Sequence, residues 1–168
     1  MIDKQTEQRI RTIYDKIVPD TVPIFGTCLF WSIAVIIALG KKERCLMQAS
    51  TCLWPRINMA EDDGIVLTHF GYEWHPESIN NQLKMNQGMM PELHTWVGLP
   101  DKQRIIDFST VFFPEQCKKL IGLDWTGPLP PQYLDVSIQK LPDYVVYKAS
   151  MDACLFADTM AAAYMSTF

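Results

Sequence analysis

Three side chains in this sequence, Cys28, His94 and Asp107, are of the types that act together in nucleophilic acyl transfer. A thiolate attacks a carbonyl carbon after a neighbouring histidine has taken the thiol proton, and the same histidine later returns a proton to the departing amine. A carboxylate bonded to the far ring nitrogen orients the histidine. We therefore expect an acyl-thioester at Cys28, with His94 as the base and Asp107 as the orienting group.

The cysteine stands in front of an unusually apolar segment, residues 26–40, which ends in a glycine followed by two lysines. This pattern predicts a helix without a polar face, buried on all sides, with a tight entry at Gly26 and a stop at Gly40. Cys28 then lies at or beside the first helical residue, where unpaired N–H groups favour the thiolate and offer one oxyanion donor. The Trp96 indole or a loop amide could be the second donor. Taken alone, the cysteine could equally begin a core helix as a small apolar residue.

A β-hairpin is predicted across residues 93–109. If a four-residue loop closes it, Trp96 lies opposite Asp107 and His94 lies opposite Ser109. His94 and Asp107 are then diagonal neighbours on one face, with Cα atoms about 7–8 Å apart, which an imidazole and a carboxylate can bridge. A loop longer or shorter by one residue would place the two side chains on opposite faces.

The order, spacing and element types resemble the transglutaminase-like branch of the papain-like cysteine enzyme superfamily. In that branch a cysteine at a helix start is followed by a strand with His-x-Trp-Val and a further strand with Ile-Asp-hydrophobic. The corresponding segments here are Gly26-Thr27-Cys28-Leu29, His94-Thr95-Trp96-Val97 and Ile105-Ile106-Asp107-Phe108.

The resemblance covers about residues 24–110 and implies that Cys28 is the nucleophile, His94 the base and Asp107 the orienting residue. It departs from the family at Thr27, where many relatives carry glycine or a polar residue, and in lacking the proline that often follows the aspartate. The arylamine N-acetyltransferases share the Cys-His-Asp order, but the arginine-glycine-glycine run before their cysteine is missing here.

Composition restricts the function classes. The chain has 168 residues, 48% of them hydrophobic and 20% charged, and a net charge of −4, which favours a single domain over residues 1–168 and no nucleic-acid partner. The apolar helix is too short to span a bilayer, and the N-terminus lacks a signal-peptide pattern. Five widely spaced cysteines fit free thiols in a reducing compartment. We expect a cytoplasmic protein with a peptide or protein substrate, no membrane partner, no metal and no other cofactor; the oligomeric state stays open.

The remaining pattern predicts an α+β fold, in which a buried central helix carrying the cysteine packs against an antiparallel sheet. Further helices are expected at 3–17, from Pro114 to Gly122 and at 150–165, and further strands at 44–54, 65–74 and 144–147. Pro55 is expected to end the strand before it. Residues 76–90 are a candidate rim or lid.

Other readings remain open. Trp74 and Trp96 could contact substrate, whereas His69 is expected to make a core hydrogen bond and His75 to be exposed. A non-catalytic interaction module that keeps a papain-like fold is the main alternative to an enzyme. Zinc bound by the cysteine, histidine and aspartate is less favoured, because the sequence offers no fourth ligand at ligand spacing.

Overall fold

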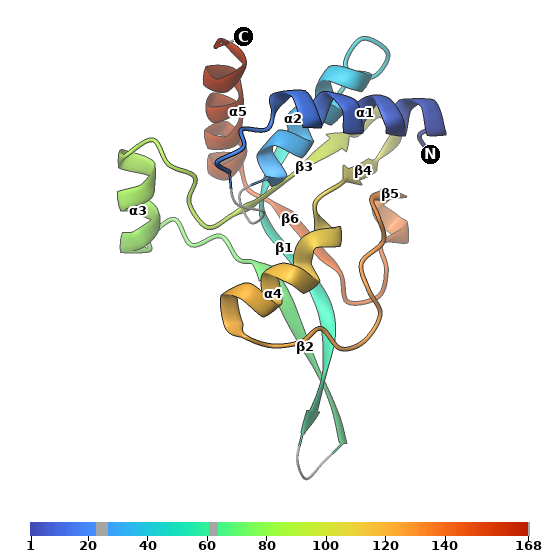
Figure 1. Cartoon of the computed structure of the whole chain (residues 1–168), viewed down its shortest axis with the longest axis vertical. Helices are drawn as coiled ribbons and strands as arrows, with labels where there is room; N and C mark the ends of the chain where they lie inside the picture. Colours follow the sequence, from blue (N-terminus) through green and yellow to red (C-terminus); the bar gives the residue numbers. More distant parts are fainter. Residues whose placement is uncertain (23–26, 61–63, 168) are drawn as a thin grey trace.

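Helices and an antiparallel sheet make up the fold, which a computed structural model describes for residues 1–22, 27–60 and 64–167 (Figure 1). The α-helices are α1 (Lys4–Ile17), α2 (Cys28–Leu39), α3 (Ile79–Asn86), α4 (Phe113–Ile121) and α5 (Met151–Met165). The strands are β1 (Leu46–Ala60), β2 (Gly64–Tyr72), β3 (His94–Leu99), β4 (Arg104–Asp107), β5 (Leu134–Ser137) and β6 (Val146–Ala149). The α+β class is confirmed.

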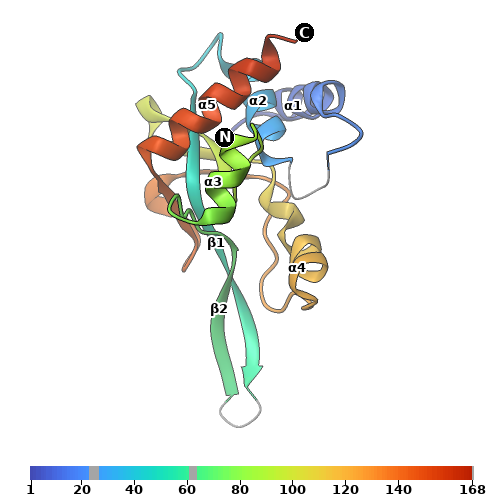
Figure 2. The ribbon, with the colours of Figure 1, turned by 90° about the vertical axis from the view of Figure 1, so that its left-hand side faces the viewer.

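Strand β1 organises the sheet, whose order is β2-β1-β3-β4-β5, with β6 also paired to β1. All pairings are antiparallel: β1 meets β3 along residues 46–50, β6 along 50–53 and β2 along 52–60. Beyond β6, the β1–β2 hairpin extends away from the rest of the molecule (Figures 1 and 2).

The prediction that Pro55 ends a strand is wrong, because β1 continues through it with Pro55 opposite His69. The backbone N–H of Ile57 donates to Thr126 O, away from β2. Residues two apart in a strand point their N–H groups the same way, so the position of Pro55 also faces away from β2. The missing N–H of proline therefore removes no hydrogen bond from the β1–β2 ladder.

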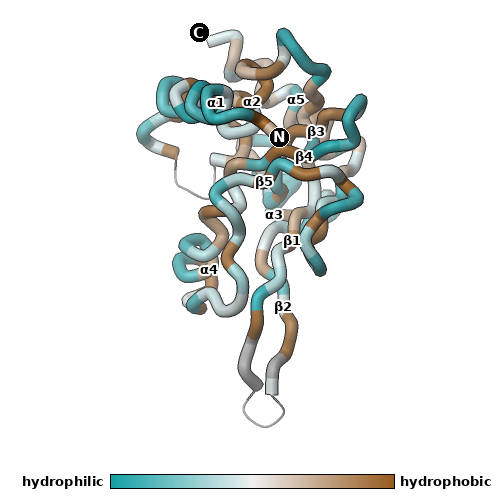
Figure 3. Tube along the Cα trace, turned by 90° about the vertical axis from the view of Figure 1, so that its right-hand side faces the viewer, coloured by the Kyte–Doolittle hydropathy of each residue, from teal (hydrophilic) through white to brown (hydrophobic). Residues whose placement is uncertain are grey.

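The two faces of the sheet carry separate apolar clusters. On one face, α1, α2 and α5 pack over β1, β3 and β4. On the other, α4 packs through Phe113 and Cys117 against Trp54, Phe70 and Trp96. Figure 3 shows the outer helix α1 as largely hydrophilic and the strands beneath it as carrying hydrophobic stretches. Strand β5, which pairs with β4, was not anticipated because it is only four residues long and follows a proline-rich connection.

Helix α2 is the buried helix that the sequence predicted. Nine of its side chains are buried, and only Ile37, at 38%, is clearly exposed among its apolar residues. It ends at Gly40, as expected, and α1 begins at the expected cap, where Asp3 accepts from the Thr6 N–H. The predicted entry at Gly26 and residues 61–63 lie outside the described part of the chain.

Helices α4 and α5 fall where they were predicted, and β2 and β6 lie within two residues of the predicted strands. Helix α3 and the loop after it occupy the segment expected to be a rim. Among the described helices, none combines the length and the apolar character needed to cross a membrane.

Candidate active site

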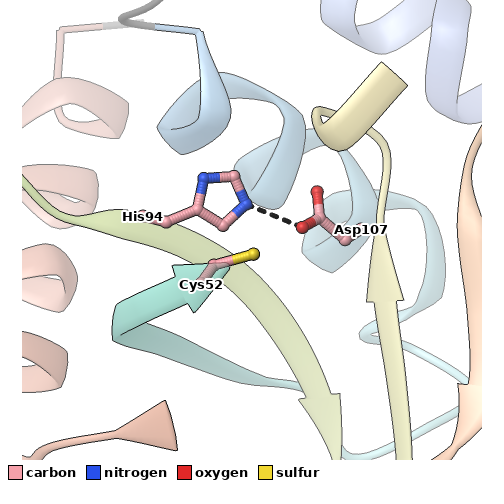
Figure 4. A group of neighbouring side chains, drawn as sticks. All are labelled: Cys52, His94 and Asp107. Carbon is pink, nitrogen blue, oxygen red and sulfur yellow. Dashed lines mark hydrogen bonds and ion pairs between the residues drawn. The ribbon is translucent and has the colours of Figure 1, made fainter. Parts of the chain in front are cut away.

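The hairpin of β3 and β4 has the predicted register. Val97 pairs with Ile106 and Leu99 with Arg104, and a short 3-10 turn with Gln103 in the left-handed conformation (φ 47°) closes the loop. His94 and Asp107 consequently share a face, and the imidazole Nε2 donates to Asp107 Oδ2 over 2.7 Å (Figure 4). The two side chains are almost completely removed from solvent, each 1% exposed. The predicted juxtaposition is confirmed.

Four donors converge on the Asp107 carboxylate. Oδ2 accepts from His94 and from the Tyr147 hydroxyl (2.7 Å), and Oδ1 accepts from the Ser109 N–H (2.8 Å) and hydroxyl (2.6 Å). Burial disfavours the charged carboxylate, but the attraction of His94 and these hydrogen bonds outweigh it and hold the pKa of Asp107 below its usual value. Asp107 is therefore an ionised acceptor that fixes the His94 ring.

Cys28 is the first residue of α2 and is partly exposed. Burial works against ionisation of its thiol, but hydrogen bonding and charge attraction from His94 prevail and lower the pKa of Cys28. Burial by itself would lower the pKa of His94. The charge and hydrogen bond of Asp107, together with Cys28, outweigh burial and raise this pKa to about 10. These directions favour a thiolate beside an imidazolium.

The second ring nitrogen of His94 is the one left for the thiol. Nδ1 is buried, and because Nε2 is bonded to Asp107, Nδ1 is the nitrogen through which His94 acts on the Cys28 thiol. In Figure 4 it points away from Asp107, toward the side on which α2 begins. His94 thus stands between the carboxylate and the start of the cysteine helix.

A polar contact inside the core ties α2 to the strand of the histidine. The Ser32 hydroxyl donates to Thr95 Oγ1 over 3.2 Å, and both side chains are buried. Ser32 is four residues after Cys28 and therefore lies on the same helix face, while Thr95 directly follows His94. This bond fixes the position of the helix start relative to the histidine.

A second thiol, which the sequence did not suggest, lies on the other side of the pair. Cys52 on β1 is fully buried, and its sulfur lies within 4.8 Å of His94 and Asp107 ligand atoms (Figure 4). Burial and the nearby Asp107 charge raise the pKa of Cys52 well above its usual value, so that it stays a neutral thiol. No local sequence pattern marks this cysteine as part of the site. Its position depends on the pairing of β1 with both β2 and β6, which is a property of the tertiary fold.

Cys52, His94 and Asp107 are all metal-ligand types, but their hydrogen bonds argue against a metal. Both oxygens of Asp107 already accept two hydrogen bonds, and His94 Nε2 donates to one of them. The group also offers three ligands where structural zinc takes four. The arrangement fits a hydrogen-bonded acid–base pair better than a zinc site.

A cavity of about 760 Å³ is lined in part by Cys28. One wall is the segment from Met89 to Leu93, which follows α3. That wall is fastened by Asn81, 2% exposed, whose side chain donates to His75 O (3.0 Å) and accepts from the Glu92 N–H (2.8 Å). The predicted rim segment therefore does border the candidate nucleophile.

The other residues singled out from the sequence lie elsewhere. Trp96 is buried against Tyr147, and Trp74 donates to Asp152 (2.9 Å); neither borders the cavity at Cys28, and their role as substrate contacts stays a prediction. The prediction of a core hydrogen bond for His69 is wrong, because it is an exposed side chain bonded to Tyr144 O (2.9 Å) on the outer part of β2. His75 is exposed, as predicted.

Comparisons of the chain with protein-family models, with curated proteins and with solved structures found no match. The function of this chain must therefore be inferred from its own residues, above all from the arrangement of Cys28, His94 and Asp107.

Proposed function

We propose that this chain is a cysteine-nucleophile enzyme of the papain-like, transglutaminase-like kind. Its reaction is the cleavage or transfer of an acyl group at an amide bond of a peptide or protein. The observation that carries the proposal is the buried His94–Asp107 hydrogen bond, 2.7 Å long, beside a partly exposed cysteine at a helix start whose thiol pKa is lowered. All five cysteines are free thiols, in keeping with a reducing, cytoplasmic setting.

In the first half of the reaction, the Cys28 thiolate attacks the carbonyl carbon and the carbonyl oxygen becomes an oxyanion. Backbone N–H groups in the first turn of α2 lack intrahelical acceptors and stabilise that charge. The His94 Nδ1–H then protonates the departing amine, the C–N bond breaks, and an acyl-thioester remains on Cys28.

In the second half, His94 Nδ1 takes a proton from water or from an acceptor amine, which attacks the thioester. The carbon–sulfur bond breaks, releasing an acid or a new amide and restoring the thiolate. Asp107 remains ionised throughout, because its four hydrogen bonds stabilise the carboxylate.

Iodoacetamide labelling followed by peptide mapping, between pH 5 and 8, tests the proposal. An ordinary thiol loses about tenfold in rate for each pH unit below its pKa of about 8.5. We expect Cys28 to keep its rate to lower pH than Cys45 and Cys154, the other two partly exposed cysteines.

Two variants sharpen this test. His94→Gln should return Cys28 to the pH profile of an ordinary thiol, whereas Cys52→Ala should leave the profile in place because Cys52 is a neutral thiol. The proposal fails if wild-type Cys28 reacts no faster than Cys45 and Cys154 at pH 6. A Cys28→Ala protein that kept its full biological effect would point instead to the non-catalytic interaction module.

A further inference from the structure

The cavity at Cys28 has a chemical character of its own. Its lining is mainly apolar, with aliphatic, thioether and aromatic side chains from α2, β2, α4, α5 and the loop after α3. Among the described residues of the lining, the charged ones are Lys84, Glu73 and Glu92. A volume of about 760 Å³ lies within the range of sites that enclose small organic ligands.

The lining comes from both faces of the sheet. Leu120 and Ile121 belong to α4, which packs on one face, and Met160 and Tyr164 belong to α5, which packs on the other. In Figures 1 and 2, α2 begins between these two helices. The lining of the cavity therefore includes residues on both sides of the start of α2, where Cys28 lies.

We infer that this cavity binds an extended peptide segment with uncharged, bulky apolar side chains on both sides of the bond presented to Cys28. The inference rests on the proposed function for the identity of that bond, but the binding itself needs no reaction. Apolar side chains leave water for a lining that can enclose them. Acidic side chains would lose their hydration in the cavity, where one lysine could attract them and two glutamates would repel them.

The wall formed by Met89–Leu93 is held in place before a peptide segment binds. Because Asn81 accepts from the Glu92 N–H of this wall and is itself bonded to His75 O, the wall is already ordered in the free protein, and less ordering is needed when a ligand binds. Leu120 is 50% exposed in the free protein, so burying it against a ligand gains apolar contact that the unbound state does not have.

The experiment measures peptide binding in a Cys28→Ala background, so that turnover and alkylation play no part. The probe is a capped, fluorescein-labelled peptide of alternating leucine and glutamine, and the comparison peptide replaces every leucine by glutamate. Fluorescence anisotropy should give a dissociation constant for the leucine peptide at least about tenfold below that for the glutamate peptide.

Each substitution at an end of the cavity has a control substitution at a residue of similar type that lies nearby in the sequence but does not line the cavity. Leu120→Glu should weaken the leucine peptide about tenfold, and Leu123→Glu, at a residue 44% exposed that does not line the cavity, should change binding by less than about twofold. Met160→Glu and Leu155→Glu form the corresponding pair on α5. Thermal unfolding checks each variant, and Met160→Gln replaces Met160→Glu if the latter does not fold.

Equal affinity for the two peptides overturns the inference, as does an effect of Leu123→Glu or Leu155→Glu equal to that of its partner. An effect at only one end overturns the claim that the segment runs past Cys28 on both sides. Alkylation of Cys28 is a separate measurement. If Cys28 keeps its alkylation rate to low pH as proposed but the protein shows no preference between the two peptides, the proposed chemistry stands and only this inference fails.

Discussion

Replacing Asp107 by asparagine removes the charge on which the hydrogen bonds of the site converge. Asparagine has one carbonyl oxygen where aspartate has two, so two of the four donors meet an NH₂ group instead of an acceptor. A hydrogen bond to a charged group contributes about 1.5–3 kcal/mol, so losing two costs about 3–6 kcal/mol. Breaking a buried ion pair by removing one partner costs a similar amount, about 3–5 kcal/mol.

Urea unfolding at pH 7 measures this cost. With a dependence on urea of about 2 kcal/mol per molar, a loss of about 4 kcal/mol lowers the unfolding midpoint by about 2 M. The same variant should shift the pH profile of Cys28 alkylation upward, because a neutral side chain no longer holds His94 as imidazolium. One substitution thus has a stability readout and a chemical readout.

Asp135→Asn is the matched control. Asp135 is also a buried carboxylate, but it accepts from the Ile2 N–H (2.6 Å) and pairs with Arg104, away from the imidazole. It should lower the unfolding midpoint while leaving the alkylation profile of Cys28 in place. If Asp107→Asn leaves that profile unchanged, or Asp135→Asn moves it as far, the reasoning about His94 is refuted.

Three further outcomes are expected. Tyr147→Phe removes one donor from Asp107 and should lower the free energy of unfolding by about 1.5–3 kcal/mol, measured in urea, with Cys28 still reactive at pH 6. Asn81→Leu leaves the Glu92 N–H of the cavity wall unpaired and should weaken the leucine peptide in the anisotropy assay while Cys28 keeps its alkylation profile. In a Cys28→Ala background, Asp107 still raises the pKa of His94, and this raised pKa contributes stability that is complete below an unfolded-state pKa of about 6.5 and is lost as the pH rises through the folded-state value. Urea unfolding between pH 6.5 and 10 should therefore show a falling stability, and adding His94→Gln should flatten that fall; an unchanged slope would contradict the assignment.

The sequence could predict the parts of the site that depend on local structure. The register of the β3–β4 hairpin follows from the length of one loop and from period-two alternation, so the contact of His94 with Asp107 was accessible before any tertiary information. The start of α2 at Cys28 follows from the apolar run after it. The hydrogen bonds of Asp107 with Ser109, two residues on, also have a sequence signal, because aspartate commonly bonds the backbone two residues ahead.

The parts that depend on long-range pairing could not be predicted. Tyr147 reaches Asp107 because β6 pairs with β1, and no local pattern specifies that partner. Cys52 enters the site by the same route, since it pairs with both Tyr72 and Tyr147. The continuation of β1 through Pro55 depends likewise on which edge of the strand the proline faces.

The two cysteines beside His94 show how the placement of charges favours the ionisation of one of two thiols. Cys28 lies at a helix start on the side of Nδ1, reaches the cavity, and is stabilised as a thiolate by the imidazolium. Cys52 is buried, and the charge of Asp107 beside it opposes its ionisation. The same carboxylate therefore acts in opposite directions on the two thiols: through His94 it favours the thiolate at Cys28, and directly it keeps Cys52 neutral. Loss of the Asp107 charge should consequently raise the pKa of Cys28 and lower the pKa of Cys52, so that the difference between the two thiol pKa values becomes smaller.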